Sequence, residues 1–475
     1  MRAKIFKNYW LLTLLFLPFI ASSCSKEEDV AESNDYCYIK SVTLGNVKRQ
    51  IASINTTFAG SSFEMTINLR DNTIENRDSL PYGSQLSAVT ANIVFDGSTL
   101  MYRPKFSNSE WTSYNSTDSL DLTRPLELYL TSNDKLSSRI YTFKVNVHKQ
   151  EGDSLYWRKC ESNVSQLTGL SNTKAFVLND KLMVLGNNGT SIILAERSGI
   201  EVRGTWEENT TDMPLTADLQ TLRQLEGTLY LSTSDGKILS SSDAKTWNQE
   251  GSDYSAPLTL IEKTKDFFYA ISVSKNENKT ICKLLRSTDA TTWEEDKLDS
   301  ETTFLPAYAI SALSVQQANG NKRIVLIGQR DSDESEVEDA TLKNAYKNAL
   351  VWYKMWNDGW KAQEKDAEWI YFPVSPDNTI PCPRLKYFNL LPYDGKCIAF
   401  GGASLDESHK ALDVMYVSQD YGVTWRPSTT IRMPAELKGT DGCITSTVDD
   451  NNFIWIITNS QVWRGRLNRL GFAQQ

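Results

Sequence analysis

The chain has 475 residues, of which 40% are hydrophobic and 23% are charged. This composition excludes a disordered or membrane-embedded protein, and the length predicts two or three domains. The formal net charge is −9. We expect no nucleic-acid partner, because nucleic-acid binding needs a basic surface that releases the counterions around the phosphates.

The N-terminal residues have the pattern of an export signal. Three basic residues within the first seven positions are followed by an apolar run over 10–20. That run is shorter than the roughly 20 apolar residues that span a bilayer, and its length is typical of a secretory signal. Small residues at 21–23 then lead to Cys24. We therefore expect a signal peptide over 1–23.

The segment around Cys24 resembles a bacterial lipobox, in which the cysteine is lipidated on its sulfur and begins the mature chain. The alternative is a simple cleaved signal with an incidental cysteine. Residues 25–29 (SKEED) resemble the acidic export signal of Bacteroidetes surface lipoproteins, and they are also typical of a solvated tether. We expect a lipid anchor at Cys24, a flexible tether over 24–35, and attachment to the outer membrane with exposure at the cell surface.

Six further cysteines are spread through the chain without a CxxC pair or metal-ligand spacing. They are Cys37, Cys160, Cys282, Cys382, Cys397 and Cys443. A disulfide between Cys382 and Cys397, on neighbouring predicted strands, is one alternative. Buried free thiols are the favoured one.

Residues 36–150 are predicted to form short strands. Over 140–148 apolar side chains alternate with polar ones, and the leucines of 126–130 alternate in the same way. Alternation with a period of two is what a strand with one buried face requires. The turn at 133–135 joins the two strands in a hairpin that resembles the closing hairpin of Ig-like modules. We expect an Ig-like β-sandwich over 36–150.

Beyond Gly152 an apolar segment recurs six times. The copies are 181–186 (KLMVLG), 228–232 (TLYLS), 267–272 (FFYAIS), 323–328 (RIVLIG), 396–401 (KCIAFG) and 452–457 (NFIWII). We interpret each as the second strand of a β-propeller blade, buried on both faces. The fold class is therefore all-β, with six blades over 153–475. Seven blades are the alternative, because the interval 329–370 is long enough for an insertion or one more blade.

A second motif follows three of these segments. Residues 418–425 (SQDYGVTW) match the Asp-box pattern SxDxGxTW, whereas 241–247 (SSDAKTW) and 287–293 (STDATTW) are one residue shorter and lack the glycine. In this motif the aspartate accepts hydrogen bonds from the backbone amides of a tight turn, and the tryptophan packs between blades. The predicted structural positions are Ser241, Asp243, Trp247, Ser287, Asp289, Trp293, Ser418, Asp420, Gly422 and Trp425.

Tryptophans predict how the ring closes. Five of the apolar segments are followed by a tryptophan at the start of a predicted outer strand, namely Trp206, Trp247, Trp293, Trp369 (or Trp360) and Trp425. The sixth is followed only by 461–467, so we predict that its outer strand is 155–159, with Trp157 in the equivalent place. Such a strand completes the last blade and removes open sheet edges.

The whole mature chain resembles a group of Bacteroidetes lipoproteins with an Ig-like domain followed by a β-propeller. The resemblance rests on the lipobox, the Asp boxes, and residues 140–148, 153–157 (DSLYW), 398–402 (IAFGG) and 462–472 (VWRGRLNRLGF). The function of this group is unknown. The resemblance therefore implies a fold and a compartment, and no activity.

No recognisable catalytic set is present. Asp boxes also occur in sialidases, but the nearest string to the sialidase Tyr/Phe-Arg-Ile-Pro motif is 102–104 (YRP), in the predicted sandwich. His148 and His409 lie in different predicted domains, which argues against a Ser-His-Asp triad or a histidine metal site. Acidic residues cluster over 331–339, where calcium binding is one alternative and a solvated loop is favoured. We expect no catalytic residue, no metal and no cofactor.

The candidate ligand-binding aromatics are Trp352, Tyr353, Trp356 and Trp360, within LVWYKMWNDGWK. Exposed aromatic rings stack on sugars, so a glycan-binding rim is one hypothesis. Burial between blades is the other and is favoured. We predict that Trp356 is the most exposed of the four.

Two functions of different classes follow. The first is a non-catalytic envelope lipoprotein, expected to be a monomer, whose propeller binds a glycan or an envelope protein. The alternative is a propeller glycoside hydrolase or lyase that uses carboxylates in its central pocket. Acidic and basic side chains that converge at one end of the channel would favour the enzyme. A flat or aromatic-lined mouth would favour the binding protein.

Overall fold

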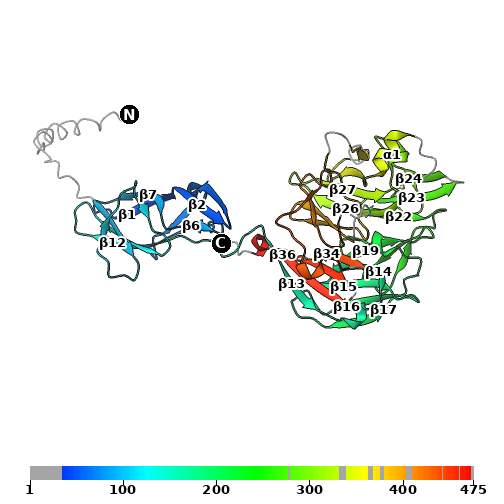
Figure 1. Ribbon diagram of the computed structural model, residues 1–475, viewed down its shortest axis with the longest axis horizontal. Helices are drawn as coiled ribbons and strands as arrows, with labels where there is room; N and C mark the ends of the chain where they lie inside the picture. The colour runs from blue at the N-terminus through cyan, green and yellow to red at the C-terminus, as the bar shows by residue number, and fades with distance from the viewer. Residues whose placement is uncertain are drawn as a thin grey trace, which may run out of the picture. The chain divides into compact units, whose positions relative to one another are not determined.

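The computed structural model describes residues 35–276, 279–330, 339–361, 367–374, 379–402, 409–440, 442–458 and 460–471. Cys24, the predicted signal peptide and nearly all of the predicted tether lie outside them. The chain divides into two units, which meet in sequence between Gly152 and Asp153 (Figure 1). Within the described ranges no helix combines the length and the apolar character needed to cross a bilayer.

The first unit consists of three sheets. One contains β1 (Tyr38–Leu44), β7 (Val89–Asp96) and β10 (Ser119–Leu120), and another contains β3 (Ile54–Ala59), β2 (Asn46–Ile51) and β6 (Ser84–Gln85). The third has the order β4 (Met65–Asn68), β5 (Thr73–Asn76), β12 (Ser138–Lys144), β11 (Leu126–Thr131), β8 (Thr99–Pro104) and β9 (Thr112–Ser113). Pairing is antiparallel except between β12 and β5. One apolar core holds the unit together, and it includes the alternating leucines of β11.

The predicted hairpin is present, because β11 pairs with β12 in antiparallel register. The predicted end of the second strand is wrong, since β12 ends at Lys144 and not at His148. The buried side chain of Asn76 is the reason. It accepts a hydrogen bond from the backbone N of Asn146 (2.6 Å) and donates to the carbonyl of the same residue (2.9 Å). Beyond Lys144, the Asn76 side chain and the backbone of Leu80 therefore bond the chain in place of β5.

In the described part of the second unit, the strands form six four-stranded antiparallel sheets. Three of them are β14 to β17 (Ser171–Leu178, Lys181–Asn187, Ile192–Arg197, Trp206–Thr210), β18 to β21 (Arg223–Leu225, Thr228–Ser232, Ile238–Ser241, Asn248–Glu250) and β22 to β25 (Leu258–Lys263, Phe268–Asn276, Lys279–Ser287, Glu294–Glu295). The others are β26 to β29 (Tyr308–Gln316, Lys322–Gln329, Leu350–Trp356, Ile370–Phe372), β30 to β33 (Asn389–Tyr393, Lys396–Phe400, Tyr416–Ser418, Arg426–Pro427), and β34, β35, β36 and β13 (Ile444–Val448, Ile454–Thr458, Gln461–Leu467, Leu155–Glu161).

Short helical turns connect these strands. They are η1 (Gly60–Ser62) in the first unit, and η2 (Ser165–Leu167), η3 (Leu219–Thr221), η4 (Thr302–Phe304), η5 (Ala435–Leu437) and η6 (Asn468–Gly471) in the second. The described residues contain one α-helix, α1 (Ala340–Tyr346), between β27 and β28. The long interval before β28 is therefore an insertion with a helix, and its described strands belong to a single sheet.

The six sheets of the second unit form a closed ring. The first strand of each lies against the first strand of the next from β18 through β22, β26 and β30 to β34, and β34 lies against β14. β14 in turn contacts η3, which directly precedes β18. This arrangement is a β-propeller whose first strands line the central channel. The six predicted apolar segments are the second strands β15, β19, β23, β27, β31 and β35, and their side chains are largely buried.

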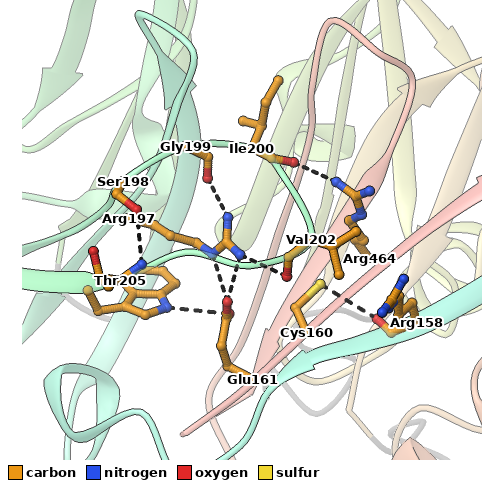
Figure 2. A network of polar contacts seen from close by, with 11 residues as sticks. Arg158, Cys160, Glu161, Arg197, Ser198, Gly199, Ile200, Val202, Thr205 and Arg464 are labelled. Carbon is orange, nitrogen blue, oxygen red and sulfur yellow. Dashed lines mark hydrogen bonds and ion pairs between the residues drawn. The ribbon is translucent and has the colours of Figure 1, made fainter.

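The ring is closed as the sequence predicts, because β13 pairs antiparallel with β36 from the C-terminal end (Figure 1). A buried ion pair ties this closing strand to the first sheet (Figure 2). Glu161 of β13 accepts hydrogen bonds from Nη2 (2.6 Å) and Nε (3.0 Å) of Arg197 on β16. The Arg197 side chain is fully buried, also donates to the Val202 carbonyl (3.1 Å), and lies over the Trp455 ring. The ring is therefore closed both by backbone pairing between β13 and β36 and by the ion pair between Glu161 and Arg197.

Candidate functional site

Two pockets of the central channel are formed by described residues, and the first is lined by charged side chains. It has a volume of about 410 Å³ and receives residues from the first strands β14, β18, β22, β26 and β30, and from β27 and β28. We call it the charged end. Its charged lining residues are Lys174, Arg223, Glu262, Lys263, Lys265, Lys322 and Asp358.

Three cations of the charged end, Lys174, Arg223 and Lys263, form no ion pair with a carboxylate of the described chain. Lys174 projects from β14, and among the described residues its ammonium has no hydrogen-bond acceptor. Burial, aided by the neighbouring Arg223 charge, lowers the pKa of Lys174 to about 8. Arg223 donates from Nε to the Ile261 carbonyl (2.5 Å) and from Nη1 to the Leu222 carbonyl (2.8 Å), which leaves Nη2 for a ligand.

Glu262 supplies a buried acidic group at the same end. Its carboxylate accepts a hydrogen bond from the Ser314 hydroxyl and another from the Lys263 backbone N (2.9 Å). Burial raises the pKa of this carboxyl, although the Arg223 charge acts in the opposite direction. A carboxyl that keeps its proton more readily repels an anion less than an ordinary glutamate does.

The remaining cations of the charged end already have partners. Lys265 pairs with Glu226 (3.1 Å) and Lys322 with Asp358 (3.8 Å), while Lys263 donates to the Thr264 carbonyl (2.7 Å). Lys174 is thus the lining cation that has no hydrogen-bond acceptor among the described residues, and Arg223 keeps one unbonded nitrogen, Nη2.

The second pocket lies where the first strands begin, and none of its lining residues is charged. It has a volume of about 280 Å³. We call it the amide end, after the side chains that distinguish it, and its polar lining residues are Asn172, Gln220, Ser311, Tyr387, Asn389 and Cys443.

Family comparisons cover both units. Residues 151–475 match the DUF6242 beta propeller domain, and residues 42–145 match the domain of unknown function (DUF6242) N-terminal domain. The chain belongs to the DUF6242 family. No curated protein matches the DUF6242 chain in sequence.

Solved structures similar to this DUF6242 chain are distant. The GH93 α-L-arabinofuranosidase of Fusarium graminearum with arabinobiose is 13% identical and has a TM-score of 0.39, over 65% of this chain and 96% of that one. The Penicillium chrysogenum α-L-arabinanase complexed with arabinobiose is 12% identical and has a TM-score of 0.37, over 66% of this chain and 97% of that one. YCF48 from Cyanidioschyzon merolae is 12% identical and has a TM-score of 0.31, over 65% of this chain and 98% of that one. TM-scores below 0.5 at this identity do not indicate shared chemistry.

The predicted aromatic segment lies on β28 and just after it. Trp352 is completely buried and Trp356 is 1% exposed, so the prediction that Trp356 is the most exposed of the four is wrong. Its ring packs edge-to-face against Phe267 and Tyr269 of the preceding sheet, although it also borders the charged end. Tyr353 and Trp360 are half-buried. The two tryptophans of β28 are thus buried in the packing between sheets and do not present an exposed ring to a ligand.

Lys354, between those tryptophans, was missed by the sequence analysis. Its ammonium is fully buried and contacts Asp296 Oδ2 (2.8 Å), which also accepts from Trp369 Nε1 (2.8 Å). The Lys354 ammonium lies over the ring of Tyr269 as well. This buried pair joins two sheets and has no solvent-facing group for a ligand.

The three predicted Asp-box turns each connect the third and fourth strands of a sheet. Asp243 Oδ1 accepts hydrogen bonds from the backbone N of Lys245 (2.8 Å) and Thr246 (2.9 Å), as expected. Asp289 and Asp420 also accept backbone hydrogen bonds within their own turns. These carboxylates are therefore occupied in holding turns.

The shorter turns replace the glycine of the full motif by alanine. Gly422 has φ +100°, and its carbonyl accepts from Trp425 Nε1 (3.0 Å). Ala244 has φ +63° and accepts equivalently from Trp247 Nε1 (3.1 Å). Both tryptophans are buried, whereas Trp293 of the third turn is half-buried.

Several other predicted features have no place in the channel. In the acidic cluster over 331–339, only Asp339 lies within the described residues, and it caps α1 by accepting from Thr341 N (2.6 Å). In the described part of the chain, no group of three or more His, Cys, Asp or Glu side chains is placed to hold a metal ion. Cys382 and Cys397 are buried free thiols, as favoured.

Sequence reasoning also missed the charged residues of the channel. Lys174, Arg223 and Glu262 each lie in the strand or segment directly before a predicted apolar segment. The strands that carry them read SNTKAFVL, RQL and LTLIEK, so a charge within a first strand was the available signal. It can be used only once those strands are known to line a channel.

Proposed function

We propose that this chain is a non-catalytic envelope lipoprotein whose propeller binds an acidic glycan in the charged end. An Ig-like first domain, six blades, Asp-box turns, a monomeric state and a lipid anchor on Cys24 at the outer-membrane surface belong to the same proposal. Six four-stranded sheets in a ring and three aspartate-held turns support the finer description of the fold.

The observation that carries the proposal is that Lys174 and Arg223, neither of which forms an ion pair within the described chain, line one concave pocket of a chain with net charge −9. Lys174 is partly buried, a partly buried ammonium without a partner is unfavourable, and an anionic ligand is the group that compensates it. A guanidinium with one free Nη2 can bind a carboxylate or sulfate by a charge-assisted hydrogen bond. The charged end therefore favours an anion.

The size and lining of the pocket favour a sugar. A volume of about 410 Å³ lies within the range of roughly 300–1,000 Å³ that is typical of small-ligand sites. Apolar side chains such as Leu222, Ala312 and Ile324 line it beside the polar groups. A uronate or sulfated sugar combines one anionic group, several hydroxyls and apolar C–H faces, and so matches this mixture.

Binding to an array of uronate-containing and sulfated oligosaccharides tests the proposal, with the detergent-solubilised full chain as the probe. We expect Lys174→Met and Arg223→Met to weaken binding by about 10- to 100-fold, the value of a hydrogen bond between charged groups. Lys48→Met, which removes the same charge from an exposed site in the first unit, is the matched control. Unchanged affinity in both channel variants, or binding of acidic peptides alone, would contradict the proposal.

The catalytic alternative is favoured by one observation, since acidic and basic side chains do converge at the charged end. Glu262, with its raised pKa, has the character of a general acid. Glycoside hydrolysis usually needs a second carboxylate facing the substrate. Asp358, the other acidic lining residue, already accepts from Trp356 Nε1 (2.9 Å) and pairs with Lys322. Mass spectrometry of each bound glycan distinguishes binding from catalysis. Cleavage of the glycan that the Glu262→Gln variant no longer performs would establish an enzyme.

A further inference from the structure

The amide end has a hydrogen-bonding pattern that its own residues leave incomplete. Gln220 Nε2 donates to Asn172 Oδ1 (3.1 Å) and to the Thr173 carbonyl (3.0 Å), so both of its N–H groups are used. In the described part of the chain, the Gln220 side-chain carbonyl and the Asn172 side-chain NH₂ have no protein partner. One fixed acceptor and one fixed donor therefore remain side by side.

A third amide, that of Asn389 at the start of β30, is also held in place. Asn389 Nδ2 donates to the carbonyls of Tyr387 (2.9 Å) and Ile444 (3.2 Å), and its Oδ1 accepts from the Ser446 hydroxyl (2.8 Å). These bonds fix the backbone next to Tyr387. The polar wall of the pocket is thus preorganised before any ligand arrives.

Exposed aromatic rings adjoin these amides. Tyr387 lines the pocket and is 60% exposed, and Tyr308, next to the lining residue Ala309, is 40% exposed. Tyr308 is held from the side, because its hydroxyl accepts from Arg384 Nη2 (3.2 Å). A large ring left in solvent beside a pocket has no structural role in the core, whereas its face can stack on the C–H face of a sugar.

Backbone strain gathers at the same pocket. Asn172 (φ +47°), Ala309 (φ +49°) and Tyr387 (φ +49°) all line it, and each lies where a first strand begins. Left-handed backbone is unfavourable for alanine and more so for tyrosine, and such residues concentrate at ligand sites. The conformation at Tyr387 is enforced by its surroundings, because Gly401 lies so close that a Cβ there would be 2.9 Å from the Tyr387 carbonyl oxygen.

We infer that the amide end is a second binding site, which takes an uncharged sugar residue. Paired amide donors and acceptors suit neighbouring hydroxyls, and the absence of charge among the lining residues gives no preference for an acidic sugar. The site uses none of the residues of the charged end. The two sites can therefore be tested, and can fail, independently.

The test measures binding of short uncharged oligosaccharides of glucose, galactose, mannose or xylose to the full chain, by saturation-transfer NMR and calorimetry. Tyr387→Asn removes the ring, and asparagine adopts the left-handed backbone more readily than tyrosine, so the melting temperature is expected to stay equal or rise. Gln220→Ala removes the free carbonyl. Each variant is expected to weaken binding by about tenfold or more.

Two control variants show whether sugar binding depends on the amide end. Tyr156→Asn removes a tyrosine that is 68% exposed on β13, outside both pockets, and is expected to leave binding unchanged. Lys174→Met alters the charged end, and uncharged sugars are expected to bind this variant normally. The inference is overturned if no uncharged oligosaccharide binds the wild-type chain, or if Tyr387→Asn and Gln220→Ala bind as wild type does.

Discussion

At the scale of single residues, Lys174 makes ligand binding depend on pH. Its pKa of about 8 means that the ammonium loses its proton between neutral and moderately alkaline solution. Only the protonated form attracts an anion. We expect the affinity for acidic glycans to fall by up to about tenfold per pH unit above pH 8, and to be nearly constant below about pH 7.

Calorimetry across this pH range checks the dependence, with Lys174→Met as the reference that should show none. The charged groups that act on the pKa of Lys174 are Arg223 and Asp218; burial lowers the pKa of Arg223 and raises that of the Asp218 carboxyl. The Lys174→Met reference separates their titration from that of Lys174. A wild-type affinity that stays constant from about pH 7 to 10 would exclude a role for the Lys174 ammonium.

At the scale of elements, the closing strand β13 depends on the pair between Glu161 and Arg197. Glu161→Ala leaves the fully buried guanidinium without its carboxylate, and breaking a buried pair in this way costs about 3–5 kcal/mol. We expect the urea midpoint of the second unit to fall accordingly. Glu161→Leu combined with Arg197→Met removes both charges and should recover much of the loss.

Glu436→Ala is the matched control for that change. Glu436 also pairs with a residue of β13, Lys159 (3.4 Å), but its side chain is 68% exposed, so its loss should leave the midpoint essentially unchanged. If Glu161→Ala and Glu436→Ala shift the midpoint equally, the buried pair does not stabilise the closure.

The elements themselves were largely predictable, because their signals are local. The second strands of the sheets are apolar on both faces whatever lies beside them, and Trp157 identifies the closing strand by its spacing. The channel was not predictable, because its first strands contain register shifts, between Ser171 and Lys174 in β14 and between Leu260 and Glu262 in β22. A bulge exchanges the two faces of a strand, so alternation in sequence does not show which charges face the channel.

The burial of the aromatic segment on β28 was also unpredictable, because it depends on tertiary packing. Trp356 looks exposed in sequence because polar residues follow it, yet Phe267 and Tyr269, which belong to the preceding sheet, cover its ring. The charge on Lys354 is compensated by Asp296, which is also distant in sequence. A contact between two sheets joins residues that are distant in sequence, so the sequence of one strand does not reveal it.

At the scale of the whole molecule, an acidic chain has no electrostatic reason to stay at a membrane. Anionic lipid surfaces attract basic segments, and a net charge of −9 disfavours that contact. We propose that the lipid on Cys24 supplies the attachment, since each buried CH₂ contributes about 0.8 kcal/mol and more than one acyl chain gives stable anchoring.

We therefore expect Cys24→Ala to move the protein from the membrane pellet to the soluble fraction, and the intact mass of the wild-type protein to include the acyl groups. Cys37→Ala, which removes a half-buried thiol from the first unit, should remain in the pellet. If the proposed lipid and not the fold holds the molecule at the membrane, glycan affinity in solution should be the same for the released chain. A Cys24→Ala protein that still sediments with membranes would show that the units themselves bind the envelope.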